Sequence, residues 1–417
     1  MPEKWGALSG VRVLDLGWAM AGPQATAILA AYGAEVIRVE SRMRPDLART
    51  TFGPILAPED PYNGSAYFSN FNRNKRSVSL NMTTAQGRAL FAELLKIADG
   101  VLENFSAGVL RRWGFPYEVM QRIRPDLVYV SMAGLGHSGP YSDYQTFGPT
   151  VQALSGLTHL SGFPEMEPAG WGFSYMDHTG GYYGAIAMLQ ALLHRRRTGE
   201  GQHVDLAQVE TAITLTGTAI LDAQVNGRAS TRIGNTSGEP PMAPHGVYRC
   251  APDPDPRVGD DAWVAIAVEH DAQWRALCAV IGASALADDP QLASVQGRQA
   301  RAPEIDARIE AWTRTRDPWQ AMDALQSAGV PAGAVQRSRD LVERDPQLRH
   351  RGMHPRVTHP LFGEHTVDGV PVRFSRTPAR VQSAGPLLGE ANNAVFTGLL
   401  GVSAAEVSAL EEAQVLW

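Results

Sequence analysis

The sequence predicts an α/β protein with a parallel β-sheet in a large domain and a second, smaller α/β domain. Strand-like and helix-like segments alternate through the first third of the chain, the pattern of a parallel sheet covered by helices on both faces. At 417 residues the chain exceeds the usual size of one hydrophobic core. A stretch rich in Gly, Pro, Asn and Ser, residues 227–257, separates the two parts.

The first repeat of this alternation is predicted as strand, turn, helix and strand over residues 11–16, 17–22, 23–32 and 35–40. Pro23 suits the first turn of the helix, and Gly33 suits its C-cap. Further strands are expected at 77–80, 100–103 and 127–132, with a helix at 84–98 and a mostly helical segment at 107–124. The ligand of such a sheet should lie beyond the carboxyl ends of its strands.

The remainder of the chain predicts a compact second unit, followed by a segment that returns to the large domain. A strand is expected at 263–268, followed by helices at 271–281, 303–314 and 318–328, and a closing helix at 404–413. The predicted organisation is therefore a large domain over 1–225, a linker with the small domain over 226–330, and a return linker with the last part of the large domain over 331–417.

Composition narrows the class of function. Hydrophobic residues make up 44% of the chain and charged residues 19%, with a net charge of −6. No basic stripe stands out, so no nucleic-acid partner is expected. No stretch reaches the ~18 apolar residues of a membrane span and no leader is evident, which predicts a soluble, cytoplasmic protein. Cys250 and Cys278 lack the spacing of a disulfide framework or a zinc site.

Asp177 is the carboxylate with the most informative surroundings. It lies in the segment 172–184, which is poor in charge and rich in small and aromatic residues. The apolar run 185–193 that follows predicts a buried helix, so Asp177 lies near the amino end of that helix. Two roles fit: a nucleophile kept ionised by helix N–H groups, or an N-cap. The residues alone favour the cap, because N-caps are far commoner.

The sequence does not match the patterns of a dinucleotide site or a metal site. The turn from Gly17 to Gly22 puts bulky residues where a dinucleotide fingerprint needs bare backbone, so nicotinamide binding is not expected. The eleven histidines are scattered, and none forms the close pair that a metal would need. His178, beside Asp177, fits a proton carrier and a polar helix start equally well. We therefore predict neither a metal nor a prosthetic group.

A series of short motifs runs through nearly the whole chain: 10–15, 21–23, 33–40, 74–77, 103–105, 114–115, 136–141, 152–156, Asp177 and 197–202. In this order and spacing, the chain resembles the class III CoA-transferases, the family of formyl-CoA transferase and carnitine CoA-transferase. The resemblance implies a Rossmann-like large domain, an interlocked homodimer, and CoA thioesters as substrates. It also makes Asp177 the expected nucleophile, in place of the helix N-cap that the residues alone favour.

The resemblance also implies which residues hold CoA. The corresponding positions here are Met20, Ala21, Asn81, Asn104, Phe105 and Arg112. Arg42 is a further candidate, because Ser41 stands where the family often has an arginine. CoA carries phosphate groups, and arginine suits them because its guanidinium forms bidentate contacts.

The implied reaction moves CoA from an acyl-CoA to a free carboxylic acid through a covalent aspartyl-CoA thioester. An acyl-CoA racemase on the same fold is one alternative, but Phe147 stands where related racemases have a histidine. A CoA-binding protein without catalysis is another.

Two local features bear on the acceptor acid. The segment 234–242 replaces the glycine run of formyl-CoA transferase with larger residues, and 389–392 departs from the family's Gly-Glu-His-Thr. Aromatic residues crowd the stretch around Asp177: Trp171, Phe173, Tyr175, Tyr182 and Tyr183, with Trp18 and Met20 on the opposite side of the groove. We therefore expect a bulky, aromatic or branched carboxylic acid as acceptor.

Overall fold

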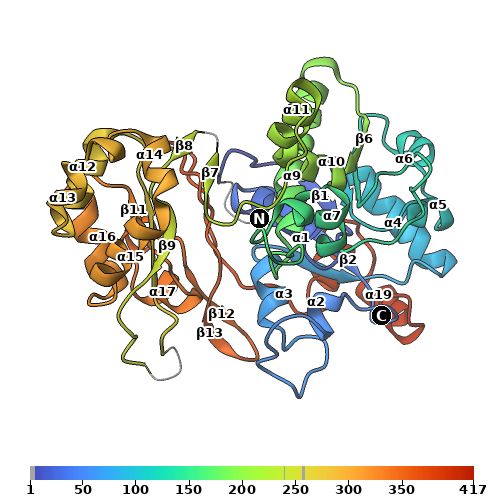
Figure 1. The fold of residues 1–417 in the computed structure, drawn as a ribbon. Coiled ribbons are helices and arrows are strands. Elements are labelled where there is room, and N and C mark those ends of the chain that lie inside the picture. The colour runs from blue at the N-terminus through green and yellow to red at the C-terminus, as the bar shows by residue number, and fades with distance from the viewer. Residues whose placement is uncertain (1–4, 239, 256–258) are drawn as a thin grey trace. The chain divides into compact units, whose positions relative to one another are not determined.

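The computed structural model describes residues 5–238, 240–255 and 259–417 and divides them into two compact units (Figure 1). The larger unit comprises the chain up to Thr158, residues 170–229 and residues 347–417. The smaller unit comprises residues 159–169 and 230–346. The predicted boundaries were at 226 and 331, and the short loop 159–169 belongs to the smaller unit without having been assigned to it. Glu239, in the segment that replaces the glycine run, lies outside the described residues.

A six-stranded parallel sheet forms the centre of the larger unit and confirms the predicted α/β class. Its strands are β1 Arg12–Asp15, β2 Glu35–Glu40, β3 Arg76–Ser79, β4 Gly100–Glu103, β5 Val128–Ala133 and β6 His203–Ala207. They lie side by side in the order β3-β2-β1-β4-β5-β6, and every neighbouring pair is parallel. The order reverses between β1 and β4, which is where open sheets of this kind bind their ligands.

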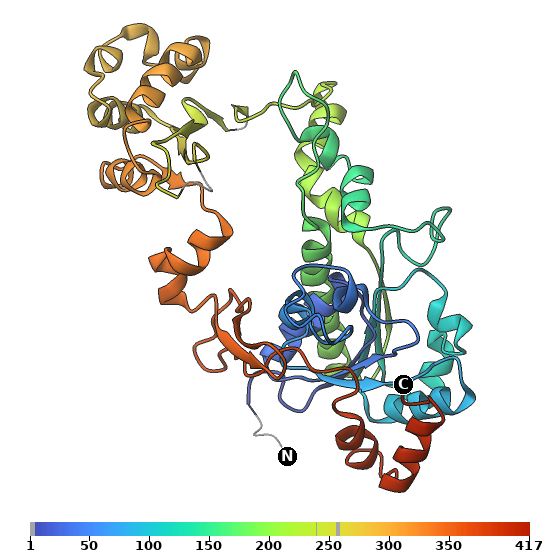
Figure 2. The same ribbon diagram turned by 90° about the horizontal axis from the view of Figure 1, so that it is seen from below.

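Both faces of the sheet are buried, and alternate residues of one strand point to opposite cores. Val13 packs with the helices α1 Ala21–Ala31 and α9 Tyr175–Thr198. Leu14, the next residue, packs with α4 Ala85–Ile97 and with the C-terminal helix α19 Ala404–Glu412. Figure 2 shows α19 on the same side as α4. The return segment therefore completes the second core of the larger unit.

The remaining elements of the larger unit are short. They are α2 Leu47–Thr50, α3 Ala66–Phe71, α5 Val109–Arg112, α6 Tyr117–Ile123, α7 Gly148–Leu154, α10 Gln208–Ile213, the 3₁₀ turn Thr214–Thr216, α11 Gly217–Asn226, the hairpin β12 Arg356–His359 with β13 Gly363–Thr366, and the π-turn Asn393–Thr397. The helices α8 Leu157–Leu160 and α18 Pro346–Arg351 lie where the chain passes between units.

The smaller unit has its own core around Trp274 and Leu277. Its strands β9 His245–Arg249, β10 Trp263–Ala267 and β11 Ala332–Ala334 form an antiparallel sheet, and β7 Ser237–Gly238 pairs with β8 Pro241–Met242. Its helices are α12 Asp271–Val280, α13 Ser284–Ala287, α14 Val295–Ala300, α15 Ala302–Thr313, α16 Pro318–Ser327 and α17 Ser338–Glu343, with a 3₁₀ turn at Pro290–Leu292.

The segment 107–124, predicted as mostly helical, is helical at both ends and interrupted in its middle. The segment forms α5 and α6 with a break between them. Gly114 has a φ of 91°, a backbone conformation that an L side chain disfavours and that ends a helix. Pro116 then takes the N-cap position of α6. A glycine and a proline two residues apart therefore outweigh the helical periodicity on either side.

A buried network of charges holds the loop that follows β1. Lys75 Nζ lies 2.8 Å from Asp15 Oδ2, and Asp15 Oδ1 accepts a 2.8 Å hydrogen bond from the Gly17 backbone N–H. Arg38 donates to the Gly17 carbonyl at 2.8 Å and pairs with Asp46, whose other oxygen accepts from the Ala19 N–H at 2.9 Å. These side chains are almost fully buried. Removing one charge would therefore leave its partner unpaired in the core, a strongly destabilising change.

Candidate active site

Asp177 is the third residue of α9 and is partly buried. Ser174 occupies the N-cap position, so the structure does not use Asp177 as the cap. Burial is the largest influence on the Asp177 carboxyl and raises its pKa to about 6, against a smaller opposing hydrogen bond with Ser174. At pH 7 and above the carboxylate is therefore ionised but poorly hydrated, the state in which it is most reactive as a nucleophile.

A glycine at the start of α7 lies directly against this carboxylate. A Cβ on Gly148 would be 2.7 Å from Asp177 Oδ2 and 3.0 Å from the Ser174 Cβ, closer than side-chain carbons approach other atoms. Any other residue at position 148 would displace Asp177 or α7. This close approach was not predicted from the sequence.

Glycines along α9 bring it onto α1. A Cβ on Gly181 would lie 3.0 Å from the Ala21 carbonyl oxygen and 2.8 Å from Gln24 Cγ, and one on Gly184 would lie 2.5 Å from Met132 Sδ. Asp177 precedes Gly181 by one helical turn. The nucleophile candidate therefore lies near the first residues of α1, beyond the carboxyl end of β1.

Met20 and Ala21, the predicted groove residues of this loop, are buried. Met20 is the N-cap residue of α1, and Ala21 is its first residue. Trp18, in the same loop, is only partly buried. The loop therefore offers a ligand its backbone and Trp18 rather than the side chains of Met20 and Ala21.

Asn104 and Phe105 follow β4 and meet this loop. The Trp18 N–H donates to Asn104 Oδ1 at 2.6 Å, and Asn104 Nδ2 donates to the Trp18 carbonyl at 3.0 Å. The Phe105 ring lies edge-on to Trp18 at 5.8 Å and to Trp113 at 5.5 Å. The residues predicted after β1 and after β4 are thus brought together at the point where strand order reverses.

Arg42 follows β2 and is exposed. Its guanidinium lies over the rings of Trp417 and Tyr62, at 5.3 and 5.7 Å from their centroids. Arg44 lies similarly over Trp18, at 5.1 Å. Two cations on aromatic rings therefore line this edge of the sheet; Arg44 and Trp417 were not predicted as site residues.

Asn81 and Arg112 have other surroundings. The Asn81 side chain accepts from the Thr83 hydroxyl at 2.6 Å and donates to the Gln414 carbonyl at 3.3 Å, which fixes the C-terminal segment against β3. Arg112 is exposed at the end of the short helix α5, close to Gly108. Neither residue contacts Asn104 or the Trp18 loop through a hydrogen bond of the described chain.

Two further side chains lie around Asp177. Burial raises the pKa of Tyr67, on α3, and the negative charges of Asp177 and Asp46 raise it further. His178 packs 5.8 Å from the Phe71 ring, and burial lowers its pKa, with Asp368 opposing. His178 is therefore neutral at pH 7, and it faces α3.

The aromatic residues near Asp177 fall into two groups. Trp171 and Tyr175 lie edge-on at 4.6 Å, and Phe173 lies 5.9 Å from Tyr175, in the segment that leads into α9. Tyr182 and Tyr183 are more than a turn further along and are exposed. Helical geometry turns these two away from the face that carries Asp177.

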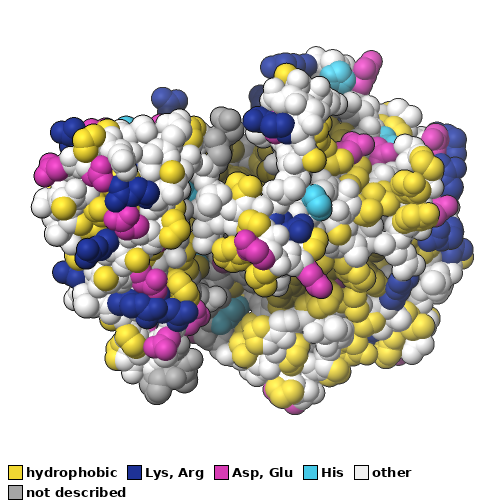
Figure 3. All heavy atoms as spheres, viewed as in Figure 1, with side chains coloured by type: hydrophobic (Ala, Val, Ile, Leu, Met, Phe, Trp, Pro, Cys, Tyr) yellow, Lys and Arg dark blue, Asp and Glu magenta, His cyan; other side chains and the backbone are white. Residues whose placement is uncertain are grey.

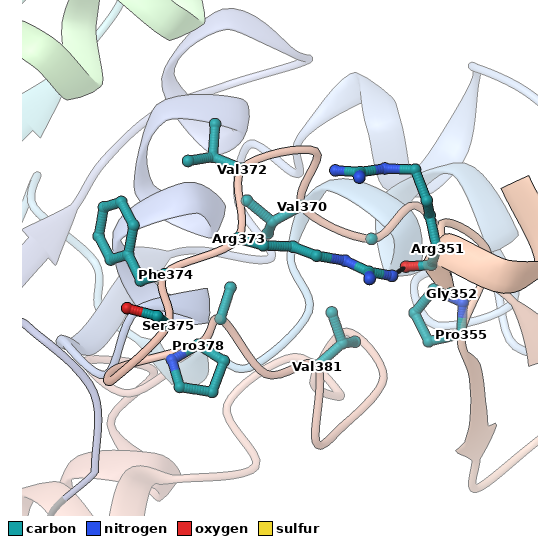
Figure 4. Close-up of a pocket in the computed structure, with 12 residues that line it drawn as sticks. Arg351, Gly352, Pro355, Val370, Val372, Arg373, Phe374, Ser375, Pro378 and Val381 are labelled. Atoms are coloured by element: carbon teal, nitrogen blue, oxygen red, sulfur yellow. Dashed lines mark hydrogen bonds between the residues drawn. The ribbon is translucent and has the colours of Figure 1, made fainter. Parts of the chain in front are cut away.

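A separate cavity of about 690 Å³ lies in the return segment of the larger unit (Figure 4). Arg351, Val372, Arg373 and Phe374 are among its lining residues, and no predicted site residue is. Arg351 donates to the Pro371 carbonyl at 3.1 Å, and Arg373 donates to the Arg351 carbonyl. Both guanidinium groups thus hold the backbone of this segment together.

Within the part of the chain that the structure describes, no group of His, Cys, Asp and Glu side chains is arranged to hold a metal ion. No described helix is long and apolar enough to cross a membrane.

Comparison with known proteins gives one consistent family. The model of CoA-transferase family III matches residues 8–392. The chain is 33% identical over 98% of its length to succinyl-CoA–D-citramalate CoA-transferase of Chloroflexus aurantiacus, and covers 98% of that protein. It is 34% identical over 98% of its length to the probable CoA-transferase Rv1866 of Mycobacterium tuberculosis but spans only 50% of that longer protein. A CaiB/BaiF family protein of Brucella suis has a similar structure, with a TM-score of 0.83, 32% identity, and coverage of 95% of this chain and 100% of its own.

Proposed function

The chain belongs to CoA-transferase family III and is a CoA-transferase, and from that premise we propose that Asp177 is its covalent nucleophile. The observation that carries the proposal is the position of Asp177: a poorly hydrated carboxylate at the amino end of α9, held against Gly148. It lies within reach of the loops at which β1 and β4 end. Asp177 thus combines reactivity with proximity to the expected CoA groove.

The proposed reaction proceeds through anhydride and thioester intermediates. Asp177 attacks the thioester carbonyl of the donor, the C–S bond breaks, and CoA leaves as a thiolate. The thiolate attacks the aspartyl carbonyl of the mixed anhydride, which releases the donor acid as a carboxylate and leaves an aspartyl-CoA thioester. The acceptor carboxylate attacks that thioester and releases the thiolate again. Attack of the thiolate on the acceptor acyl carbonyl then gives the new acyl-CoA and restores Asp177.

CoA is proposed to lie along the carboxyl edge of the sheet. Asn104 and Phe105 would hold its pantetheine arm, and Arg42 and Arg44 its phosphate groups, since both arginines are exposed beside aromatic rings. Trp18 offers a stacking surface for the adenine. Asn81 acts indirectly in this scheme, by fixing the segment that carries Trp417.

The intermediate can be trapped. With an acyl-CoA donor alone, hydroxylamine should convert Asp177 to a hydroxamate that mass spectrometry finds on its peptide. Asp177→Ala should abolish both the trapped product and transfer while leaving CoA binding within a few-fold. Asp143→Ala, which removes an exposed acid, is the matched control and should behave as wild type. Full transfer activity in the Asp177 variant would end the proposal.

For the acceptor we retain a bulky, aromatic or branched acid. The cluster of Trp171, Phe173 and Tyr175 directly before Asp177 supports this choice, because its rings offer apolar surface to a substrate. Tyr182 and Tyr183 no longer contribute, since they lie on another face of α9. A small dicarboxylic acid is a second candidate, because the Chloroflexus relative is named for succinyl-CoA and D-citramalate.

Comparing kcat/KM for phenyllactate, benzylsuccinate, succinate and oxalate decides between these acceptors. A preference of tenfold for the aryl acids, about 1.4 kcal/mol, would support the aromatic cluster as the acceptor site. Oxalate or succinate as the best acceptor would replace it with the second candidate. Exchange of the α-proton of an acyl-CoA with deuterium, without transfer, would instead indicate a racemase.

The functional unit is proposed to be an interlocked homodimer. Tyr182, Ile186, Leu189 and Leu193 form an exposed apolar stripe along α9, with exposures between 39 and 50%. Their spacing keeps them on one face of the helix. Figure 3 shows further apolar patches on the larger unit. Apolar surface on this scale favours association, and a monomer by light scattering at micromolar concentration would contradict the proposal.

A further inference from the structure

A cluster of ionisable side chains surrounds the carboxyl end of β4, alongside the neighbouring strands β5 and β6, and takes no part in the proposed chemistry. Its centre is Glu103, the last residue of β4, whose side chain is 1% exposed. Glu103 Oε2 accepts a 2.6 Å hydrogen bond from the Phe105 N–H, and Oε1 accepts a 2.8 Å hydrogen bond from the Tyr129 hydroxyl. A buried carboxyl therefore fixes the backbone of the residue proposed to touch CoA.

His137 is the group that faces Glu103 from the loop after β5. Its Nε2 lies 3.4 Å from Glu103 Oε1 and, among the described residues, forms no aligned hydrogen bond. The His137 backbone N–H donates to both carboxylate oxygens of Asp205, at 3.0 and 3.1 Å. The imidazole is thus held in place through its own backbone, with one ring nitrogen close to Glu103.

The loop that carries His137 leads to Asp177. It leaves β5 at Gly134, where a Cβ would be 1.8 Å from Thr146 Oγ1, so the two ends of the loop meet. Gly148, two residues past Thr146, lies against the Asp177 carboxylate. A contact between Glu103 and His137 therefore ties the CoA-side loop to the loop that ends at the nucleophile.

The surrounding groups decide the charge of this pair. Those that face it are Tyr129 and Ser131 of β5, with His203 and Asp205 of β6. From α6, Tyr117 packs on Tyr129 and His203, and the charge of Glu118 acts on His203 rather than on the pair. Asp15, on β1, is engaged with Lys75 and Arg38 instead. The pKa of Glu103 is raised to about 7: burial is the main cause and the charge of Asp205 adds to it, against the opposing hydrogen bonds from Tyr129 and Phe105. Burial lowers the pKa of His137. Below about pH 7 the Glu103 carboxyl therefore carries a proton that it can share with His137.

Resting on the CoA site proposed above, we propose that Glu103 and His137 are a positioning pair. A proton shared between Glu103 Oε1 and His137 Nε2 holds the CoA-binding loop after β4 against the loop that leads to Gly148. When the carboxyl ionises, it places a second negative charge beside Asp205, and two residues from Phe105, where the anionic CoA is to bind. CoA binding then weakens, while the chemistry at Asp177 continues.

The test measures the Kd for free CoA by titration calorimetry from pH 6.5 to 8.5, with kcat measured separately. The wild-type Kd should rise about three- to tenfold over this range, because Glu103 loses its proton. Glu103→Gln mimics the protonated acid and can donate to His137. Its Kd should stay within twofold of the wild-type value at pH 6.5, beyond the change contributed by the phosphate groups of CoA. Glu118→Gln removes an exposed acid of the same region and should keep the wild-type pH dependence.

Two further variants keep the proposal falsifiable if Glu103→Gln folds poorly. Tyr129→Phe removes a hydrogen bond that favours the ionised carboxyl, so the rise in Kd should move to higher pH. His137→Ala should raise the Kd several-fold at pH 6.5 and change kcat by less than about threefold. A Glu103→Gln protein that keeps the full pH dependence, or that binds CoA equally weakly at every pH, would overturn the pairing. Wild-type protein that binds no CoA would instead overturn the proposed function.

Discussion

Gly148 gives the sharpest test of the site, because one methyl group there meets the proposed nucleophile. In Gly148→Ala the new Cβ would lie 2.7 Å from Asp177 Oδ2 and 3.2 Å from its Cγ. Ordinary contact begins at 3.4 Å, so the carboxylate or the start of α7 must move by about 0.7 Å. Neither neighbour is the free end of a long side chain, since α7 continues with Pro149 and Asp177 is fixed in α9.

The size of the effect follows from how strictly nucleophilic attack depends on geometry. A misplacement of about 1 Å can cost on the order of 10²-fold in rate. We therefore expect kcat to fall about 10- to 100-fold in Gly148→Ala, equivalent to about 1.4–2.7 kcal/mol in the barrier. The KM for the acyl-CoA should change less than threefold, because the proposed CoA contacts lie on other loops.

The assay is steady-state transfer between an acyl-CoA and its best acceptor, with Gly170→Ala as the matched control. Gly170 also lies in the larger unit, but a Cβ there meets nothing within 4 Å, so this variant should behave as wild type. Thermal unfolding of both variants checks that the larger unit stays folded. A folded Gly148→Ala protein with wild-type kcat would show that the carboxylate need not hold this position, which refutes the geometric argument.

Four other outcomes are expected. The wild-type kcat should fall as pH drops through about 6, because the Asp177 carboxyl takes up a proton and ceases to be a nucleophile; a kcat independent of pH down to 5 would contradict this. Asp177→Asn should be inactive yet raise the thermal midpoint at pH 8 and not at pH 3. Because the pKa of Asp177 is raised to about 6 in the folded protein, ionisation of its carboxyl begins to destabilise the fold above about pH 4. Above about pH 6 the full cost is about 1–2 kcal/mol, after allowance for partial exposure, and the amide of the variant removes it. Arg49→Met should lower the free energy of unfolding, measured with urea, by about 3 kcal/mol, because it breaks the buried 2.7 and 2.8 Å contacts to Glu40. The control Arg339→Met removes an exposed ion pair with Glu343 and should lower it by less than about 1 kcal/mol. Leu189→Glu should prevent assembly of the proposed dimer, so that the expressed variant is a monomer in light scattering, since it puts a charge on the apolar stripe of α9.

The sheet could be predicted because each of its buried strands is marked locally. The strands at 35–40 and 100–103 are found with their predicted bounds, and α9 begins two residues before Asp177. In contrast, β6 was not predicted, because its burial pattern leaves the first three residues of this edge strand partly exposed or exposed. The order of strands was also beyond prediction, since it depends on contacts between distant segments, such as the pairing of Val13 with Gly100.

Residues of the candidate site could be predicted where they belong to a sequence motif. They could not be predicted where their role depends on contact between two distant segments. Asp177, Asn104 and Phe105 came from motifs with a resemblance to guide them. Gly148 did not, because its role exists only once α7 folds onto α9. Tyr182 and Tyr183 were grouped with the site by nearness in sequence, yet a helix turns residues five and six places further on away from Asp177.

The same reasoning explains why Glu103, the last residue of β4, belongs to the site although its sequence neighbourhood does not show it. Its partners come from β5, from the loop after β5, and from β6, and the parallel sheet brings these strands alongside the end of β4. Each partner alone is an ordinary tyrosine, histidine or aspartate. Together they leave Glu103 with hydrogen-bond donors but no permanent cation, unlike Glu40, which two arginines hold at a pKa of about 2 against the effect of burial. Two buried glutamates on strands of one sheet therefore differ in what they can do: Glu40 stays ionised and stabilises the fold, whereas Glu103 changes charge near neutral pH beside the proposed CoA groove.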